Sequence, residues 1–315
     1  MNTLFIVIPC YNEEEVLPIT AEKMCEKLNF LINADKISKQ SRVLFVDDGS
    51  KDKTWDIISN FSKNEELVEG LKLSRNKGHQ NALLAGLMEA KKHCDMAISI
   101  DADLQDDINA IDKMVDEYLC GIDIVYGVRS SRKKDSFFKK TTAQGFYKIM
   151  KSLGVDIVYN HADFRLMSNR ALQELSEYQE VNLFLRGIVP LIGFRYSTVE
   201  YERLERFAGE SKYPLKKMLS FAFDGITSFS VKPIRFITVI GFIMFIISFI
   251  ALIYSLCAKL FFDTVVGWTS LVGSIWMLGG IQLLSLGIIG EYVGKIYFET
   301  KKRPKYHIDE NTINE

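Results

Sequence analysis

Several features that define other protein classes are missing from this sequence. The cysteines show no C-x-x-C pair and no zinc-ligand spacing, which argues against a disulfide framework and a structural metal and favours a reducing compartment. No G-x-G-x-x-G follows the first apolar run and no G-x-x-x-x-G-K-[ST] occurs, so a dinucleotide-binding Rossmann enzyme and a P-loop NTPase are disfavoured. The five cysteines are Cys10, Cys25, Cys94, Cys120 and Cys257.

An excess of either charge sign is also missing. The 315 residues include 39 Lys and Arg and 40 Asp and Glu, which gives a net charge of −1 at pH 7. Such a chain has no overall field that would hold a nucleic acid, and we expect no nucleic-acid partner. An anionic ligand must be bound by cations that the fold gathers in one place.

Two long stretches contain no Asp, Glu, Lys or Arg, from Phe236 to Ala258 and from Thr264 to Gly290. Because about 20 apolar residues cross a bilayer, we expect a two-helix transmembrane hairpin over residues 235–290, with spans at about 236–258 and 266–289. Two buried core helices are the alternative. Glycines in the second span would allow close helix packing, within the hairpin or in a homo-oligomer. They are Gly273, Gly279, Gly280 and Gly287.

Basic residues flank the outer ends of these two stretches, whereas the connection between them offers only Lys259 and Asp263. The positive-inside rule then predicts a multi-pass protein of the cell membrane with both termini in the cytosol. The start of the chain agrees, since it lacks the basic segment of a signal peptide. Residues 291–315 are predicted to form a cytosolic basic tail. The flanking residues are Arg235, Lys295, Lys301, Lys302, Arg303 and Lys305.

Residues 214–234 mix apolar and basic side chains just before the first apolar stretch. Lys216, Lys217 and Lys232 stand among apolar residues such as Leu219 and Phe221. This composition predicts an amphipathic helix in a membrane interface, with an ordinary surface helix as the alternative.

Short apolar runs alternate with segments of helical period from residue 3 to about 127. This alternation predicts an α/β fold with a doubly wound, mostly parallel sheet, within a cytosolic domain of residues 1–213. Ligands of such sheets bind at the carboxyl ends of the strands, and a polar segment follows each apolar run. Further on, a helix is predicted over Phe137–Leu153 and a strand near Phe164–Met167. The apolar runs are Leu4–Ile8, Val43–Val46, Leu67–Leu73, Met96–Ile100 and Ile122–Tyr126.

One polar segment carries two carboxylates, Asp101 and Asp103, with Gln105 two residues further on. Hard oxygen ligands that leave room for phosphate oxygens and water suit Mg²⁺ or Mn²⁺, and a bound ion would stabilise a departing diphosphate. The alternative is a solvated turn that caps the helix expected near Asp107.

The turn that contains Asp47 and Asp48 offers acceptor oxygens for a ribose or a base N–H. An ordinary turn with Ser50 or Asp52 as the helix N-cap is equally compatible with these residues.

The turn after the first apolar run carries Tyr11, which could stack on a base, and Glu13, which could hold a hydroxyl. Asn12 as a helix N-cap, with acidic residues complementing the helix dipole, is compatible with the same segment. In a third turn His79 reads as a structural residue, because no partner stands near it in the sequence.

The order of these motifs resembles family 2 glycosyltransferases. The C-terminal motifs are similar to the polyprenyl-phosphate glycosyltransferases, the group of dolichyl-phosphate mannose synthase and the bactoprenol glucosyltransferases. The motifs that carry the resemblance are Pro9-Cys10-Tyr11-Asn12-Glu13, Val46-Asp47-Asp48-Gly49-Ser50, Arg75-Asn76-x-Gly78, Asp101-Ala102-Asp103-Leu104-Gln105-Asp106, Asp163-Phe164-Arg165-Leu166, Arg206-x-x-Gly209-Glu210-Ser211-Lys212-Tyr213, Gly287-Ile288-Ile289-Gly290-Glu291-Tyr292 and Arg303-Pro304-x-Tyr306.

The resemblance implies a GT-A fold and the inverting, metal-dependent transfer of one sugar from a nucleotide-diphosphate sugar, expected to be a UDP-sugar. The implied acceptor is a membrane polyprenyl phosphate such as undecaprenyl phosphate, and the implied role is modification of a cell-envelope glycan. Two alternatives are a processive polysaccharide synthase, which would need more spans and a Gln-x-x-Arg-Trp motif, and a nonenzymatic membrane scaffold that binds a nucleotide sugar.

The resemblance also implies roles for individual residues. Asp163 matches an acidic position often assigned as the base, but a phosphate with a second pKa near 6 is already largely ionised at pH 7. Positioning Arg165 or the sugar is therefore the alternative role for Asp163. The implied sets are Pro9, Tyr11, Glu13, Asp47, Asp48, Asp101 and Ala102 for the nucleotide sugar, Asp101, Asp103 and Gln105 for Mg²⁺ or Mn²⁺, Arg129, Arg206 and Lys212 for the acceptor phosphate, and Asp103, Asp163 and Arg129 for catalysis.

Overall fold

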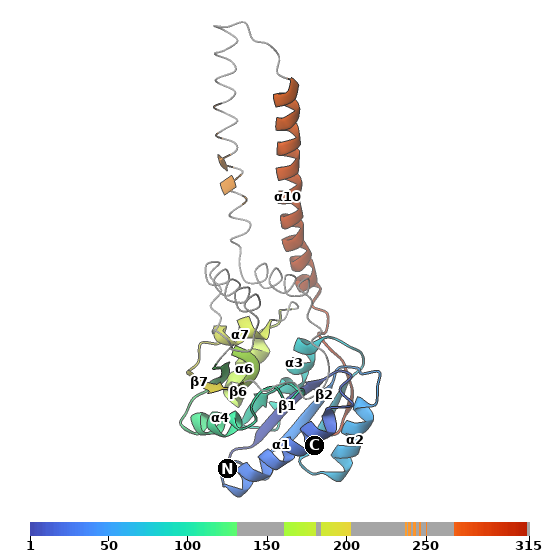
Figure 1. Cartoon of the computed structure of the whole chain (residues 1–315), viewed down its shortest axis with the longest axis vertical. Coiled ribbons are helices and arrows are strands. Elements are labelled where there is room, and N and C mark those ends of the chain that lie inside the picture. Colours follow the sequence, from blue (N-terminus) through green and yellow to red (C-terminus); the bar gives the residue numbers. More distant parts are fainter. Residues whose placement is uncertain are drawn as a thin grey trace.

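The structure, a computed structural model, describes residues 1–130, 161–180, 184–202 and 268–313, with isolated positions between 237 and 250. Strands and helices alternate through the first 130 residues (Figure 1). They are β1 (Leu4–Cys10), α1 (Leu17–Asn33), β2 (Arg42–Asp47), α2 (Thr54–Asn64), β3 (Val68–Leu73), α3 (His79–Ala90), β4 (Met96–Ser99), α4 (Ala110–Leu119) and β5 (Ile124–Arg129). The later elements are β6 (His161–Ser168), α6 (Asn169–Glu177), α7 (Leu185–Leu191), β7 (Tyr196–Tyr201), α10 (Trp268–Lys301) and β8 (Ile308–Asn311).

All the described strands join one eight-stranded sheet in the order β7-β5-β6-β4-β1-β2-β3-β8. The pairs β4-β1, β1-β2, β2-β3 and β5-β7 are parallel, as the β-α alternation predicts. β6 is antiparallel to both β4 and β5, and β8 is antiparallel to β3. The mixed sheet fits the expected GT-A-like fold, and the predicted strand near Phe164–Met167 lies within β6. The predicted helix over Phe137–Leu153 lies outside the described residues.

Both faces of the central strands are buried, which explains why β1, β2 and β4 read as continuous apolar runs. Leu4, Ile6 and Ile8 of β1 face a core that includes buried residues of α1, α2 and α4. Phe5 and Val7 face a second core, with buried residues of α3, α6 and α7. The period-2 alternation of side chains thus divides one strand between two cores. Helices on both faces leave the strand ends open for the polar loops.

The end of the chain returns to the sheet. β8 pairs with β3, Lys72 lies 2.6 Å from Glu310, and Thr312 Oγ1 accepts the backbone N–H of Gly70 at 2.7 Å. β7 forms one edge of the sheet and β8 forms the other. Strands from two distant parts of the sequence, Tyr196–Tyr201 and Ile308–Asn311, thus lie at opposite edges of the sheet. The stretch expected to be a basic tail therefore contains the last turns of α10 and the strand β8.

The predicted membrane anchor needs correction. Among the residues that the structure describes, none of the helices combines the length and the apolar character that a membrane crossing requires. This finding contradicts the two-helix transmembrane hairpin and the predicted two-span location with cytosolic termini. α10 does not end near 289 but continues to Lys301, because no proline interrupts it before Pro304.

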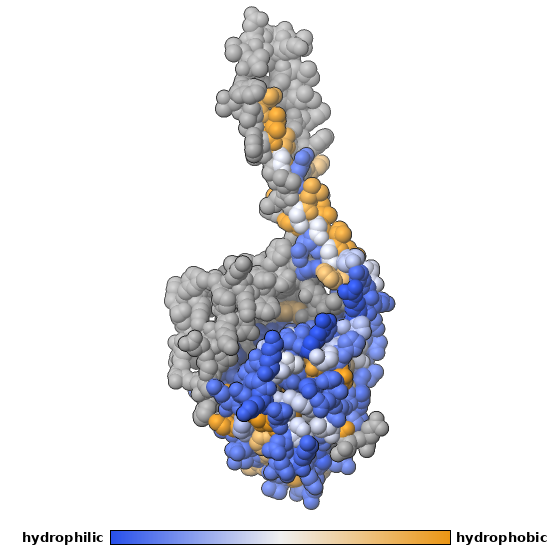
Figure 2. Space-filling model, turned by 90° about the vertical axis from the view of Figure 1, so that its right-hand side faces the viewer, coloured by the Kyte–Doolittle hydropathy of each residue, from blue (hydrophilic) through white to orange (hydrophobic). Residues whose placement is uncertain are grey.

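The uncharged stretch is thus one part of a longer helix whose last turns include Glu291, Lys295 and Glu299. Figure 2 shows hydrophobic and hydrophilic surface side by side on the part of α10 next to the sheet. Most of the first predicted span, 236–258, and all of the predicted interfacial helix, 214–234, lie outside the described residues.

Candidate active site

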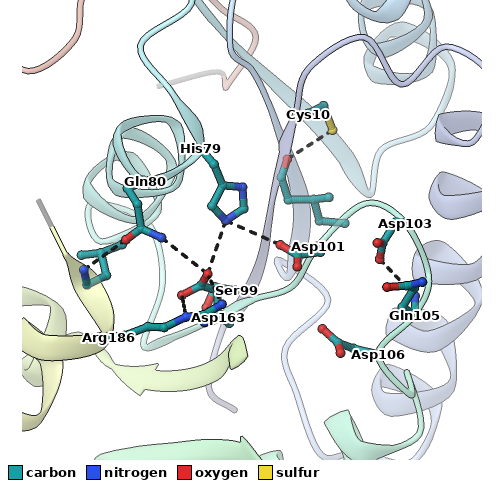
Figure 3. A network of polar contacts seen from close by, with 12 residues as sticks. Cys10, His79, Gln80, Ser99, Asp101, Asp103, Gln105, Asp106, Asp163 and Arg186 are labelled. Carbon is teal, nitrogen blue, oxygen red and sulfur yellow. Dashed lines mark hydrogen bonds and ion pairs between the residues drawn. The ribbon is translucent and has the colours of Figure 1, made fainter. Parts of the chain in front are cut away.

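The polar loops expected at the strand ends lie together at the carboxyl ends of the parallel strands β1, β2 and β4. Asp101 and Asp103 follow β4, and Asp163 lies in β6, which runs antiparallel beside β4. The Ser99 hydroxyl at the end of β4 donates to the backbone carbonyl of Asp163 and ties the two strands together. His79 begins α3 and points toward Asp101 and Asp163 (Figure 3). Residues far apart in the sequence therefore meet at one site.

The loops after β1 and β2 bind each other. The backbone N–H of Asn12 donates to Ser50 Oγ at 3.0 Å, and Asn12 Oδ1 accepts the backbone N–H of Lys51 at 2.9 Å. The Glu13 N–H donates to Thr54 Oγ1 at 2.9 Å. Asn12 therefore bridges two loops and does not act as an N-cap. Tyr11 beside them is 40% exposed.

Asp47 and Asp48 are both buried and both build the loop backbone. Asp47 accepts the N–H of Ser50 at 3.1 Å, and the two oxygens of Asp48 accept the N–H groups of Lys77 and Gly78 at 2.7 and 2.8 Å. Burial raises the pKa of Asp48, and the two backbone hydrogen bonds partly offset this. The Asp48 carboxylate thus holds the turn from which α3 begins.

Gly49 lies where this turn approaches the loop after β3. Its φ is +66°, and a Cβ there would lie 2.6 Å from the backbone carbon of Arg75. Gly121 has a φ of +91° with no atom within 4 Å of its Cβ position, so it serves as the matched control.

We expect Gly121→Ala to lower the free energy of unfolding by about 1 kcal/mol through backbone strain alone. Gly49→Ala should cost about 2 kcal/mol more, because the overlap with a backbone carbon forces the two loops apart. Denaturant unfolding of both variants measures the difference. Equal losses would show that the two loops tolerate separation.

The loop after β4 carries the predicted metal ligands. Asp101 Oδ1 lies 3.6 Å from His79 Nε2, whereas Asp103 Oδ1 accepts the backbone N–H of Gln105 at 3.2 Å. Burial, with the negative charges of Asp163, Asp106 and Asp103, raises the pKa of Asp101 to about 6, although His79 opposes this. The loop supplies hard oxygen donors and an excess of negative charge, which is the environment that Mg²⁺ or Mn²⁺ favours.

Within the described part of the chain, no group of three or more His, Cys, Asp or Glu side chains is arranged to hold a metal ion. The predicted set of two carboxylates with the Gln105 amide is not a group of this kind, so it stays a prediction. Figure 3 shows the Asp103 carboxylate in contact with Gln105.

Asp163 is the most heavily bonded carboxylate of the site. It is 5% exposed and accepts from Arg165 Nη2 at 2.9 Å and from Arg186 Nη2 at 3.0 Å, and its Oδ2 lies 3.6 Å from His79 Nε2. Burial alone would raise its pKa, but Arg186, His79 and Arg165 hold the pKa well below its ordinary value. Asp163 is therefore ionised at neutral pH and is a poor proton acceptor.

Arg129, at the end of β5, is held by two side chains. Its Nε donates to the Tyr201 hydroxyl at 3.3 Å, and its Nη2 lies 3.4 Å from Asp106 Oδ1. The Tyr201 hydroxyl also donates to Asp106, which is buried. The other two predicted phosphate ligands, Arg206 and Lys212, lie outside the described residues.

The sequence motifs did not single out all the side chains of this site. His79 read as structural because its partner Asp163 stands 84 positions later in the chain. Arg186 was missed, although an arginine within the apolar run 184–189 is itself a signal of a buried or functional charge. The remaining missed side chains are Gln80, Asp106 and Tyr201.

Comparisons with known proteins show which family and which relatives this chain resembles. The family model described as Glycosyl transferase family 2 matches residues 5–176. An uncharacterized glycosyltransferase of Bacillus subtilis (strain 168), YkoT, is 58% identical over 99% of this chain and 93% of its own length. A prophage bactoprenol glucosyl transferase homolog of Escherichia coli (strain K12) is 39% identical over 96% of this chain and 97% of its own length. The bactoprenol glucosyl transferase of Shigella phage SfV is also 39% identical, over 96% of this chain and 97% of its own length.

Proposed function

This chain belongs to glycosyl transferase family 2 and is a glycosyltransferase, and from that premise we propose that it transfers one sugar from a nucleotide-diphosphate sugar to a polyprenyl phosphate. The observation that supports a polyprenyl phosphate as the acceptor is the 39% identity to bactoprenol glucosyl transferases over 96% of the chain. The site supports a sugar transfer, because carboxylates and arginines gather at the carboxyl ends of the parallel strands. Residues 1–213, with β8 added at the sheet edge, form the proposed catalytic unit.

The donor side of the proposed site is formed by the loops after β1, β2 and β4. Tyr11 is exposed for stacking on the base, and the half-buried Glu13 can accept a hydroxyl. The buried Asp47 and Asp48 fix the loops around them. The proposed donor-binding residues are Pro9, Tyr11, Glu13, Asp47, Asp48, Asp101 and Ala102.

Asp101, Asp103 and Gln105 would hold a Mg²⁺ or Mn²⁺ ion, and such an ion supplies positive charge to the departing diphosphate. The crowding of Asp101 by other carboxylates supports this assignment, since a cation relieves that repulsion. The remaining ligands of the ion would be phosphate oxygens and water.

The acceptor phosphate needs orientation more than deprotonation. Its oxygen forms a bond to the anomeric carbon while the bond from that carbon to the diphosphate breaks, and attack from the opposite face inverts the configuration. With a second pKa near 6 the phosphate is already largely ionised at pH 7, and Asp163 is bound by cations. Asp163 therefore acts in this proposal as a positioning residue, and Arg129, with Arg206 and Lys212, binds the acceptor phosphate.

The test incubates the purified full-length chain with undecaprenyl phosphate, Mg²⁺ or Mn²⁺, and a panel of radiolabelled UDP- and GDP-sugars. Label from one donor should enter the organic phase with the lipid, one sugar per lipid. Label in an insoluble polymer would instead indicate a processive synthase. Binding of a nucleotide sugar without any transfer would contradict the proposed reaction.

A further inference from the structure

Asp163 is bound by two guanidinium groups, although its single negative charge needs only one positive charge to balance it. Arg165 lies beside it in β6, has a side chain only 1% exposed, and donates to Asp163 Oδ1 at 2.9 Å. Arg186 comes from α7 and makes two bonds to the same carboxylate, from Nε to Oδ1 at 3.2 Å and from Nη2 to Oδ2 at 3.0 Å. Arg186 thus supplies a second positive charge beside Asp163, and the Asp101 carboxylate lies on the other side of His79.

The backbone that carries Arg186 is fixed from two sides. The N–H of Leu185 donates to Gln80 Oε1 at 3.0 Å, and the carbonyl of Leu185 accepts from Arg165 Nη1 at 3.3 Å. Gln80 belongs to the first turn of α3 and Arg165 belongs to β6, so these two elements together set where α7 begins. A cation held in this way binds a ligand without a large ordering cost.

Arg186 remains accessible from outside the protein. Its side chain is 39% exposed, whereas that of Asp163 is 7% exposed. Figure 3 shows Asp101 between two groups of side chains, which are His79, Asp163 and Arg186 on one side and Asp103, Gln105 and Asp106 on the other. In the proposed function the donor diphosphate occupies the side of Asp103. A second anion would therefore approach the reacting carbon from the side of Arg186.

We propose that Arg186 binds the phosphate group of the acceptor and that Asp163 positions its guanidinium. This inference rests on the proposed function and adds a residue that the sequence motifs do not contain. A guanidinium recognises phosphate oxygens through paired N–H groups and keeps its charge at all relevant pH values.

The test replaces Arg186 with Met, which keeps the length of the side chain and removes the charge. We expect KM for undecaprenyl phosphate to rise about 10- to 100-fold, because the variant loses a hydrogen bond to a charged group. KM for the donor sugar and inhibition by the product nucleoside diphosphate should change less than about twofold, because the donor side is untouched. Arg186→Lys should give an intermediate KM for the acceptor, since it keeps the charge and loses the paired geometry.

Arg170→Met is the matched control, because Arg170 lies on α6 with its guanidinium 3.9 Å from the Phe194 ring centroid and belongs to another surface. It should leave both KM values unchanged. Thermal unfolding of each variant checks the fold.

If Arg186→Met raises KM for the donor, or leaves KM for the acceptor unchanged, the inference is wrong while the proposed function stands. If the wild-type chain transfers no sugar to undecaprenyl phosphate, the proposed function fails and the inference fails with it.

Discussion

Replacing Asp101 by Asn should lower the rate of sugar transfer by about 10³-fold, the upper range for losing one electrostatic group at a reacting centre. Asn keeps the size of the side chain and removes its charge. Asp101 lies between His79 and the loop of Asp103, so it faces both sides of the proposed site. No other side chain among those described occupies this position, and we expect no compensation from its neighbours.

The measurement is the initial rate at saturating donor and acceptor, with Mn²⁺ binding followed separately in the absence of substrate. Asp107→Asn is the control, since Asp107 belongs to the same loop and its carboxylate accepts the backbone N–H of Asn109 at 2.9 Å. Removal of the metal by EDTA should abolish transfer by the wild-type chain, and added Mn²⁺ should restore it. An Asp101→Asn variant with wild-type rate would remove Asp101 from the proposed metal site.

Replacing Arg165 by Met should lower the free energy of unfolding by about 3 kcal/mol, which is the cost of removing one partner of a buried ion pair. Arg165 is almost fully buried and contacts both the Asp163 carboxylate and the carbonyl of Leu185. Without it, Asp163 keeps Arg186 and His79 as partners, which limits the loss to the lower end of the expected range. The Leu185 carbonyl loses a donor at the same time.

Denaturant unfolding measures this loss, and a double-mutant cycle with Asp163→Asn assigns it. The double variant should be more stable than the sum of the two single losses predicts, because both single losses include the same Arg165–Asp163 ion pair. Arg170→Met, whose guanidinium covers an aromatic ring at the surface, should cost no more than about 1 kcal/mol. Strict additivity in the cycle would mean that Arg165 and Asp163 act independently.

The alternation of strands and helices was predictable because strands buried on both faces must be apolar along their whole length. Each polar segment that follows such a strand was predictable for the same reason, since it marks where burial ends. The orientation of β6 and β8 was not predictable, because a strand's direction depends on its partner and not on its own composition. The extent of α10 was misjudged because a run without charge defines a composition and not the ends of a helix.

In the candidate site, too, features of one short segment were predictable from the sequence, and contacts between distant segments were not. The carboxylates of the loop after β4 could be singled out from one short segment. The bonds of Asp163 to His79 and Arg186 join residues from α3, β6 and α7, so their pairing required the fold. Sequence patterns identified which residues carry charge, and the structure identified which charges meet.

The position of β8 bears on how the protein is made. Residues 308–311 form the edge strand next to β3, although β3 itself ends at Leu73. During synthesis β3 emerges early and keeps an unpaired edge until residues 308–311 have left the ribosome, and an unpaired edge strand is prone to pair with other chains. A chain that stops before residue 308 keeps that edge open. Pairing of β8 with β3 therefore covers an edge that would otherwise favour association between chains.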